Sequence, residues 1–301
     1  MSTISNLALA QTLTDQLSTQ EGSIAKLQEQ LATGQVLNQP SDNPAAVTQV
    51  LALSGQASQL SSWQANVDTT TSWLGTANNT ANDALESMQS AQSLLLQALN
   101  QGAQDSTTYQ ALGDQLQGVV SNLLSLANTQ FEGRPIFAGT SASPQAYDSS
   151  GNYLGNTDAP NAVIGPGSGV GQTVNMSVPG TTMFGVGSSN VFATLSTVAA
   201  ALSSGTPTSA QLTSALSALS TNMATAQQAS ADLGDASQEV ASISSSLTTQ
   251  IASVQTDQAD LQDVNVATAM TQLDSETTNY QAALWAASQA IPETLVKFIA
   301  P

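Results

Sequence analysis

The chain has 301 residues, of which 41% are hydrophobic but only 4% aromatic, so it can bury a core that is thin and elongated. Three basic residues against 21 acidic ones give a formal net charge of −18, which argues against binding to nucleic acid or to anionic membranes. Cysteine and histidine are both absent, which removes disulfides, thiol and imidazole catalysis and the usual transition-metal ligands.

The first predicted helix covers residues 10–31, where apolar side chains recur with a heptad spacing. The remaining positions are mostly Gln, Ser and Thr, so the apolar seam is narrow and needs a partner helix. Gly34 is expected to end this helix, because glycine readily adopts a left-handed conformation there. The seam residues predicted in this segment are Leu13, Leu17, Ile24, Leu27 and Leu31.

A second helix is expected to begin near Asn43. The short polar side chains between Pro40 and Pro44 can accept hydrogen bonds from the first free amides of a helix, and proline suits its first turn. Apolar residues then continue, with breaks, to about residue 100. A turn is predicted at 102–108, followed by a helix over 109–128.

The middle of the chain has a different composition. Ten of the 20 glycines lie between Gly139 and Gly187, together with four prolines, and a continuous helix cannot persist there. Alternating apolar and polar residues at 170–178 and 181–184, divided by a Pro-Gly pair, predict a small module of strands and turns.

Helical patterning resumes at Val191 and continues to the end of the chain. Two parallel heptad rows are expected near the C-terminus, one of Val266, Leu273, Tyr280 and Ala287, the other of Met270, Thr277, Leu284 and Ile291. The predicted assembly seam of this half consists of Val266, Met270, Leu273, Tyr280, Leu284 and Ile291.

These patterns predict a mainly α fold, an elongated antiparallel helical bundle or coiled coil built from both chain ends, with a small β-rich insert. The expected domains are a terminal coiled-coil segment (1–40 with 265–301), a helical rod (41–138 with 191–264) and the insert (139–190). Packing of each seam against other subunits would satisfy the same pattern. We expect the terminal segments to order only when several copies pack, because one pair of narrow seams buries little apolar surface.

The segment from Glu29 to Ala46 carries the helix-ending glycine and then the sequence Pro-Ser-Asp-Asn-Pro-Ala-Ala. This run resembles the N-terminal hallmark of the flagellin-like family of flagellar axial proteins. The C-terminal stretches 263–273, 280–284 and 292–298 are similar to the closing helix of the same family. The motif residues in the N-terminal hallmark are Pro40, Ser41, Asp42, Pro44, Ala45 and Ala46.

Two further segments distinguish branches of that family. Residues 128–139 and 171–184 resemble the branch of hook-associated proteins that joins hook to filament more than they resemble filament flagellin. The motif residues in the first of these segments are Gly133, Phe137 and Gly139.

The resemblance implies a structural, non-enzymatic subunit of the bacterial flagellum, located outside the cell. It implies export in an unfolded state by the flagellar type III apparatus, and assembly at the hook tip with other copies in a ring or tube. Implied partners are a neighbouring hook-associated protein, flagellin and an export chaperone. Filament flagellin remains the alternative, and a secreted coiled-coil adhesin or effector a remote one.

Three aspartates near the C-terminus could in principle bind a cation. Asp257, Asp260 and Asp263 share one helical face, but three spaced carboxylates are usually a solvated face, so no metal and no cofactor is assigned.

The N-terminus shows no cleavable secretory signal, and no stretch reaches the roughly 20 apolar residues of a membrane span. The three tryptophans, Trp63, Trp73 and Trp285, suit subunit contacts and core packing equally well.

Overall fold

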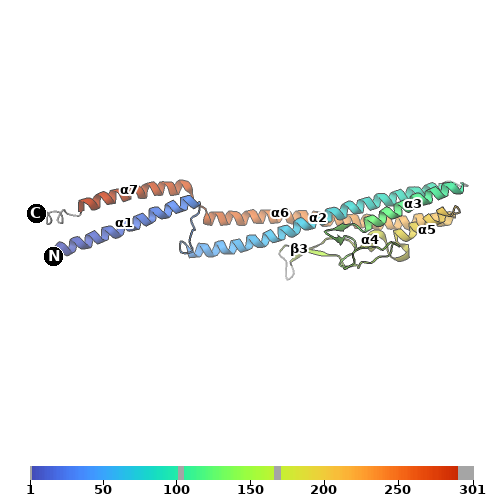
Figure 1. Cartoon of the computed structure of the whole chain (residues 1–301), viewed down its shortest axis with the longest axis horizontal. Helices are drawn as coiled ribbons and strands as arrows, with labels where there is room; N and C mark the ends of the chain where they lie inside the picture. Colours follow the sequence, from blue (N-terminus) through green and yellow to red (C-terminus); the bar gives the residue numbers. More distant parts are fainter. Residues whose placement is uncertain (1, 101–104, 166–170, 291–301) are drawn as a thin grey trace. The chain divides into compact units, whose positions relative to one another are not determined.

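The computed structural model describes residues 2–100, 105–165 and 171–290 (Figure 1). Most of these residues are helical, and two small antiparallel sheets lie in the middle of the sequence, which confirms the predicted mainly α fold with a β-rich insert. The chain divides into two compact units, Met1–Ser58 with Ile251–Pro301 and Gln59–Gln250. The helices are α1 (Ser2–Thr33), α2 (Pro44–Asn100), α3 (Ser106–Ala127), α4 (Gly180–Phe184), α5 (Val191–Ser203), α6 (Ser209–Gln262) and α7 (Val266–Ala290).

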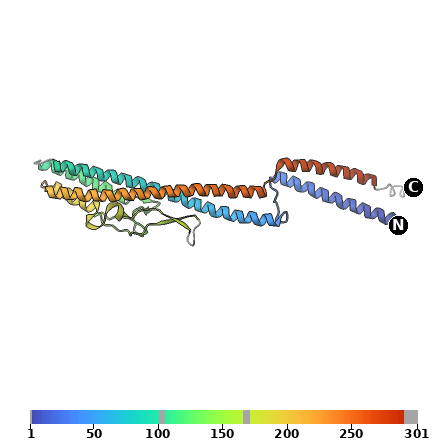
Figure 2. The same cartoon turned by 180° about the vertical axis from the view of Figure 1, so that it is seen from behind.

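In the first unit, α1 and α7 lie side by side and run in opposite directions (Figures 1 and 2). The α1 helix ends where expected: Gly34 has a φ of 75°, and its amide donates to the carbonyl of Gln30 at 2.8 Å. Asn43 caps α2, because its Oδ1 accepts a hydrogen bond from the amide of Ala46 at 3.1 Å.

The α2 helix corrects one expectation, since it continues from Pro44 to Asn100 without the predicted breaks. Its interior glycines, Gly55 and Gly75, carry only the modest cost of glycine in a helix, about 1 kcal/mol each, and packing along the helix offsets it. The α3 helix likewise begins at Ser106, inside the predicted turn, of which residues 102–104 lie outside the described residues.

In the second unit, hydrogen bonds show that α2 and α6 pack antiparallel. Asn78 donates through Nδ2 to Ser237 Oγ at 2.9 Å, and Gln64 donates to Ser244 Oγ at 3.2 Å. The buried face of α2 is rich in alanine, which allows a small distance between neighbouring helices. A shorter pair, α3 and α5, packs together in the same unit. The helix predicted to resume at Val191 is confirmed as α5.

The β-rich insert contains two hairpins, β1 (Gln130–Phe131) with β2 (Arg134–Pro135) and β3 (Asn161–Gly165) with β4 (Gln172–Asn175). Its core is a cluster of aromatic rings, among which Tyr147 lies 4.8 Å from Phe192 and 5.7 Å from Phe184 between ring centroids.

Two details of the predicted insert differ from the structure. The expected strand at 181–184 is wrong, because these residues form α4. Pro179 precedes this helix with a φ of −58°, which suits helix entry, and one turn of helix buries both Met183 and Phe184, whereas adjacent strand residues point to opposite faces. Of the stretch 170–178, only Gln172–Asn175 is a strand, and residue 170 lies outside the described residues.

Candidate functional site

The terminal helix pair covers only part of the predicted seam. On α1, the five seam residues are partly covered, and each is neither fully buried nor fully exposed: Leu13, Leu17, Ile24, Leu27 and Leu31. On α7, Leu273 and Tyr280 are also partly covered, while Ala269 and Ala287 are buried at 4% and 8% exposure. The covered positions of α7 therefore follow the heptad spacing. The first and last of them are alanines, and small side chains let the two helices approach closely.

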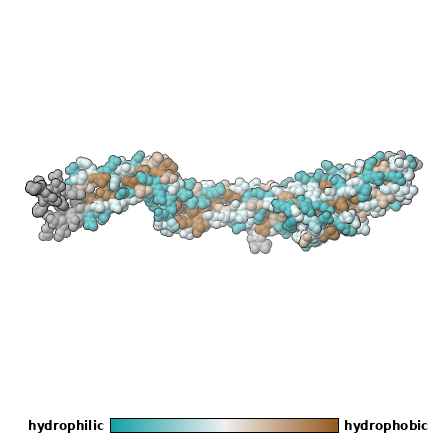
Figure 3. Space-filling view, viewed as in Figure 1, coloured by the Kyte–Doolittle hydropathy of each residue, from teal (hydrophilic) through white to brown (hydrophobic). Residues whose placement is uncertain are grey.

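Met270 and Leu284 of the second predicted row stay exposed, as does Val266 of the first row, whereas Thr277 of the second row is partly covered. Within the pair, large apolar side chains remain exposed on the outer side of α7, and Figure 3 shows hydrophobic surface over the terminal helices. The exposed fractions are 53% for Val266, 56% for Met270, 43% for Leu284 and 70% for Trp285. Ile291 lies outside the described residues. Leu273, Tyr280 and Ala287 of the first predicted row lie on the covered side of α7. Ala269 and Ala283 complete that side, and the heptad prediction left them out because alanine gives a weaker hydrophobic signal than Met or Leu.

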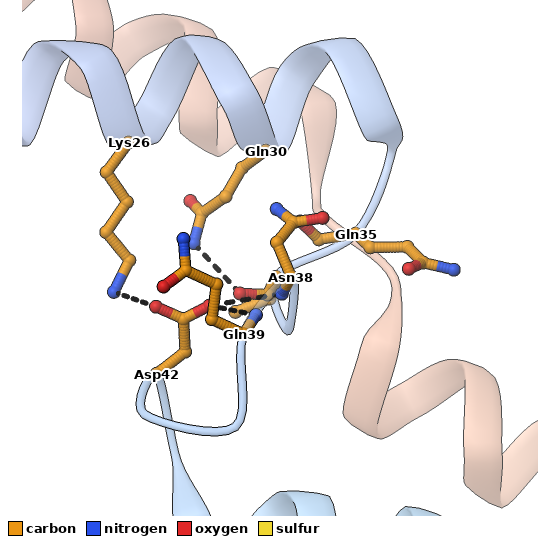
Figure 4. A network of polar contacts seen from close by, with 7 residues as sticks. Lys26, Gln30, Gln35, Asn38, Gln39 and Asp42 are labelled. Atoms are coloured by element: carbon orange, nitrogen blue, oxygen red, sulfur yellow. Dashed lines mark hydrogen bonds and ion pairs between the residues drawn. The ribbon is translucent and has the colours of Figure 1, made fainter.

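The turn that follows α1 is held by an ion pair (Figure 4). Lys26 Nζ lies 2.9 Å from Asp42 Oδ1. The other oxygen of the same carboxylate accepts hydrogen bonds from the amides of Asn38 and Gln39 at 3.1 and 2.9 Å. The hydrogen bond from Lys26 and those from the two amides hold the pKa of Asp42 below its usual range. Asp42 thereby fixes the loop to the helix that precedes it.

A short ladder of backbone hydrogen bonds joins the two connectors of the first unit. Gln35 and Asp263 form an antiparallel bridge. The amide of Val36 donates to Gln262 O at 2.7 Å, and the amide of Val264 donates to Gly34 O at 2.9 Å. The connector from α1 to α2 is therefore hydrogen-bonded to the connector from α6 to α7.

The N-terminal motif acts mainly through its acidic and amide residues. Pro40, Ser41, Pro44 and Ala45 are exposed, whereas Ala46 is buried at 8% exposure. Asp42 carries the loop contacts, and Asn43 caps α2. Sequence reasoning missed Lys26 as the partner of Asp42. The sequence did contain a signal for this pair: the chain has only three basic residues, and Lys26 is the one that lies close to the motif.

The second motif organises the β-rich insert. Glu132 and Gly133 both have positive φ angles, 49° and 78°, and form the two-residue turn between β1 and β2. Phe137 is fully buried, and its ring meets that of Phe184 at 5.4 Å. Gly139 has a φ of 68°, and a Cβ there would lie 2.5 Å from the carbonyl oxygen of Asn156, so only glycine fits.

Asn128 connects the end of α3 to the insert. Its Nδ2 donates to the carbonyl of Tyr147 at 3.0 Å, and its Oδ1 accepts from the amide of the same residue at 2.9 Å. Paired bonds of this kind give the amide side chain one orientation. This contact places the aromatic cluster next to the helical part of the second unit.

The described residues offer no group of three or more acidic side chains arranged to hold a metal ion. Asp257, Asp260 and Asp263 thus do not form such a group. None of the described helices combines the length and the hydropathy required to cross a membrane.

Family models of two regions match the chain: the bacterial flagellin N-terminal helical region over residues 4–142 and the C-terminal helical region over residues 216–299. The chain belongs to the flagellin-like family. The predicted resemblance is therefore confirmed at both ends of the sequence. This family consists of flagellar structural proteins, which confirms the expectation of a non-enzymatic subunit of the flagellum, an extracellular structure.

Curated relatives include flagellar hook-associated protein 3 of Salmonella typhimurium, 32% identical over 132 residues, which are 43% of this chain and 41% of that protein. The protein of the same name from Escherichia coli is 31% identical over 137 residues, 44% of this chain and 43% of that protein. The chain thus spans about two fifths of the length of the curated relatives it matches.

Solved structures share the fold at low identity. A Vibrio parahaemolyticus protein provisionally named a flagellar hook-associated protein aligns with a TM-score of 0.67 at 19% identity, covering 74% of this chain and 100% of that one. Bacillus cereus FlgL aligns with a TM-score of 0.59 at 22% identity, covering 69% of this chain and 99% of that one.

Proposed function

We propose that this protein is the structural subunit that joins the hook to the filament of a bacterial flagellum. The support comes from relatives named hook-associated protein 3 and from the row of exposed apolar side chains on α7. A helix of a stable monomer usually turns such side chains inward. Their exposure in the single chain fits a terminal segment whose remaining apolar surface is covered by neighbouring copies.

In this role the chain assembles with copies of itself as a ring or a tube. It also contacts a neighbouring hook-associated protein on one side and flagellin on the other. It is exported unfolded through the flagellar type III apparatus with the help of a chaperone. The partly covered seam of α1 and α7 supports this route, because a segment with little buried surface needs little energy to unfold.

Filament flagellin is the alternative function, since the matched family models describe flagellin regions. The two roles differ in copy number and position. A deletion strain separates them. Loss of a junction subunit leaves hooks without filaments while flagellin is still secreted into the medium, whereas loss of a filament subunit removes flagellin itself. Immunogold labelling of isolated flagella should mark one narrow band at the hook tip and not the length of the filament.

The role of α7 is tested by complementing the deletion strain. Met270→Glu with Leu284→Glu places two charges on the exposed apolar row, and filament attachment should be lost. The matched control, Gln272→Glu with Asn279→Glu, adds the same charge at exposed polar positions on another face of the same helix and should restore attachment. Normal filaments with the first variant would contradict an assembly role for this face.

A further inference from the structure

A groove runs along the terminal helix pair and is lined mostly by α1. Its volume is about 490 Å³. The wall from α1 includes Leu13, Leu17 and Gln20, and α7 contributes Ala283. Leu13, Leu17 and Ala283 form the apolar part of the lining. The other lining residues are polar: Thr12, Asp15, Gln16, Thr19 and Gln20.

Gln20 makes this groove chemically specific. Its Oε1 is buried and has no hydrogen-bond partner among the described residues. A buried acceptor without a donor is unfavourable and is uncommon in folded proteins. The terminal torsion of a glutamine side chain has a broad energy profile, so a donor that enters the groove can be met by rotation of the Gln20 amide.

The same helix pair carries a side chain of the complementary kind. Trp285 on α7 is 70% exposed, more than Met270, the next most exposed large apolar residue of that helix. Its ring is large and apolar, and its indole N–H is a donor with no acceptor function. Tryptophan, with tyrosine and arginine, is enriched among the residues that contribute most of the binding energy near the centre of protein interfaces.

We infer that Trp285 of one copy inserts into the groove of a second copy and donates its indole N–H to Gln20. This inference rests on the proposed function and specifies one contact of the assembly. Because the donor and the acceptor lie on different surfaces of the same chain, each copy offers one of each. Contacts of this head-to-tail type propagate into rings or helical tubes.

The absence of cysteine from the sequence gives a direct test. Gln16→Cys places a thiol on the groove wall, and Ser288→Cys places one a helical turn beyond Trp285. The two single-cysteine variants, with different tags, are co-expressed in the deletion strain, and isolated flagella are oxidised. Any heterodimer that forms joins two copies. We expect it to form, because a disulfide requires Cα atoms within about 7 Å.

Variants of the tryptophan then identify the contact. Trp285→Ala, made in both co-expressed chains, should reduce the heterodimer yield about tenfold or more. Val186→Ala removes an apolar side chain of similar exposure, 63%, in the second unit and should leave the yield unchanged. Trp285→Phe should give an intermediate yield. In chains that already carry Gln20→Leu, adding Trp285→Phe should not lower the yield further, because the hydrogen bond is already absent. Circular dichroism of each purified variant checks that helix content is kept.

The outcomes separate this contact from the proposed function. Filaments attached in the co-expressing cells without a 16–288 heterodimer would overturn the contact and leave the junction role intact. An equal heterodimer yield with Trp285→Ala would overturn it as well. Normal filaments in the deletion strain itself would instead overturn the junction role.

Discussion

Lys26 reaches across the turn after α1 to Asp42, with Nζ 2.9 Å from Oδ1. This contact ties a helix to the loop that leads to the next one, and the same carboxylate also accepts the amides of Asn38 and Gln39. We expect Asp42→Ala to speed hydrogen exchange at both amides more than Lys26→Met does, because the first change removes all three bonds. Equal exchange in the two variants would show that the ion pair, and not the amide bonds, holds the loop.

The protection of these amides should also depend on pH. Because the pKa of Asp42 is below its usual range, the folded state favours the carboxylate. The contribution of this carboxylate to the stability of the folded loop is present above the ordinary aspartate pKa of about 4. It is lost as the pH falls through the lowered pKa. Hydrogen exchange at Asn38, corrected for intrinsic rates, should be constant from pH 7 to 5 and should rise below about pH 4. Asp42→Asn should remove this dependence.

Two glycines of the first unit should respond oppositely to the same substitution. Gly34 has a φ of 75° at the end of α1, so Gly34→Ala should lower the free energy of unfolding by about 1–2 kcal/mol. Gly22 lies inside α1 with nothing within 4 Å of an added Cβ, so Gly22→Ala should raise it by about 0.5–1 kcal/mol. Urea unfolding followed by circular dichroism measures both, and shifts of the same sign would contradict the assignment of Gly34 as the helix end.

A second glycine pair tests the close contacts of the insert. In Gly133→Ala the added Cβ has no atom within 4 Å, so only the backbone is strained. The free energy of unfolding should fall by about 1–2 kcal/mol. Gly139→Ala adds a collision with the backbone of Asn156 to a similar strain, and it should cost about 1–3 kcal/mol more. If denaturant unfolding gives equal losses, the approach of Asn156 is not rigid.

The two tyrosines of the insert, Tyr147, which is buried, and Tyr153, which is partly buried, should differ in their need for a hydroxyl. Tyr153 donates to carbonyl oxygens, Phe137 O at 2.9 Å or Asn156 O at 2.7 Å, and Tyr153→Phe should lower the free energy of unfolding by about 0.5–1.5 kcal/mol. Tyr147 has a buried hydroxyl without a partner among the described residues, so Tyr147→Phe should be neutral or stabilising. Thermal unfolding of the two variants gives this comparison, and a large loss with Tyr147→Phe would indicate a bound water.

Helix boundaries were largely predictable from local signals. Gly34 ended α1 and Asn43 began α2 as expected, because capping depends on residues adjacent in the chain. The insert was less predictable. Residues 181–184 form a helix although their pattern resembled a strand, since burial of Met183 and Phe184 in the aromatic cluster decides their conformation.

The sequence by itself determined the helical ends, the interrupted middle, the family motifs and the exclusion of cysteine and histidine chemistry, because these depend on composition and on neighbours along the chain. The tertiary structure decided which face of α7 is covered, the pairing of Lys26 with Asp42 and the ladder between residues 34–36 and 262–264. Heptad spacing marks several possible faces of a helix, and the partner helix selects among them by how closely it can approach. Here α1 packs on the alanine-rich face, and Trp285 is left exposed.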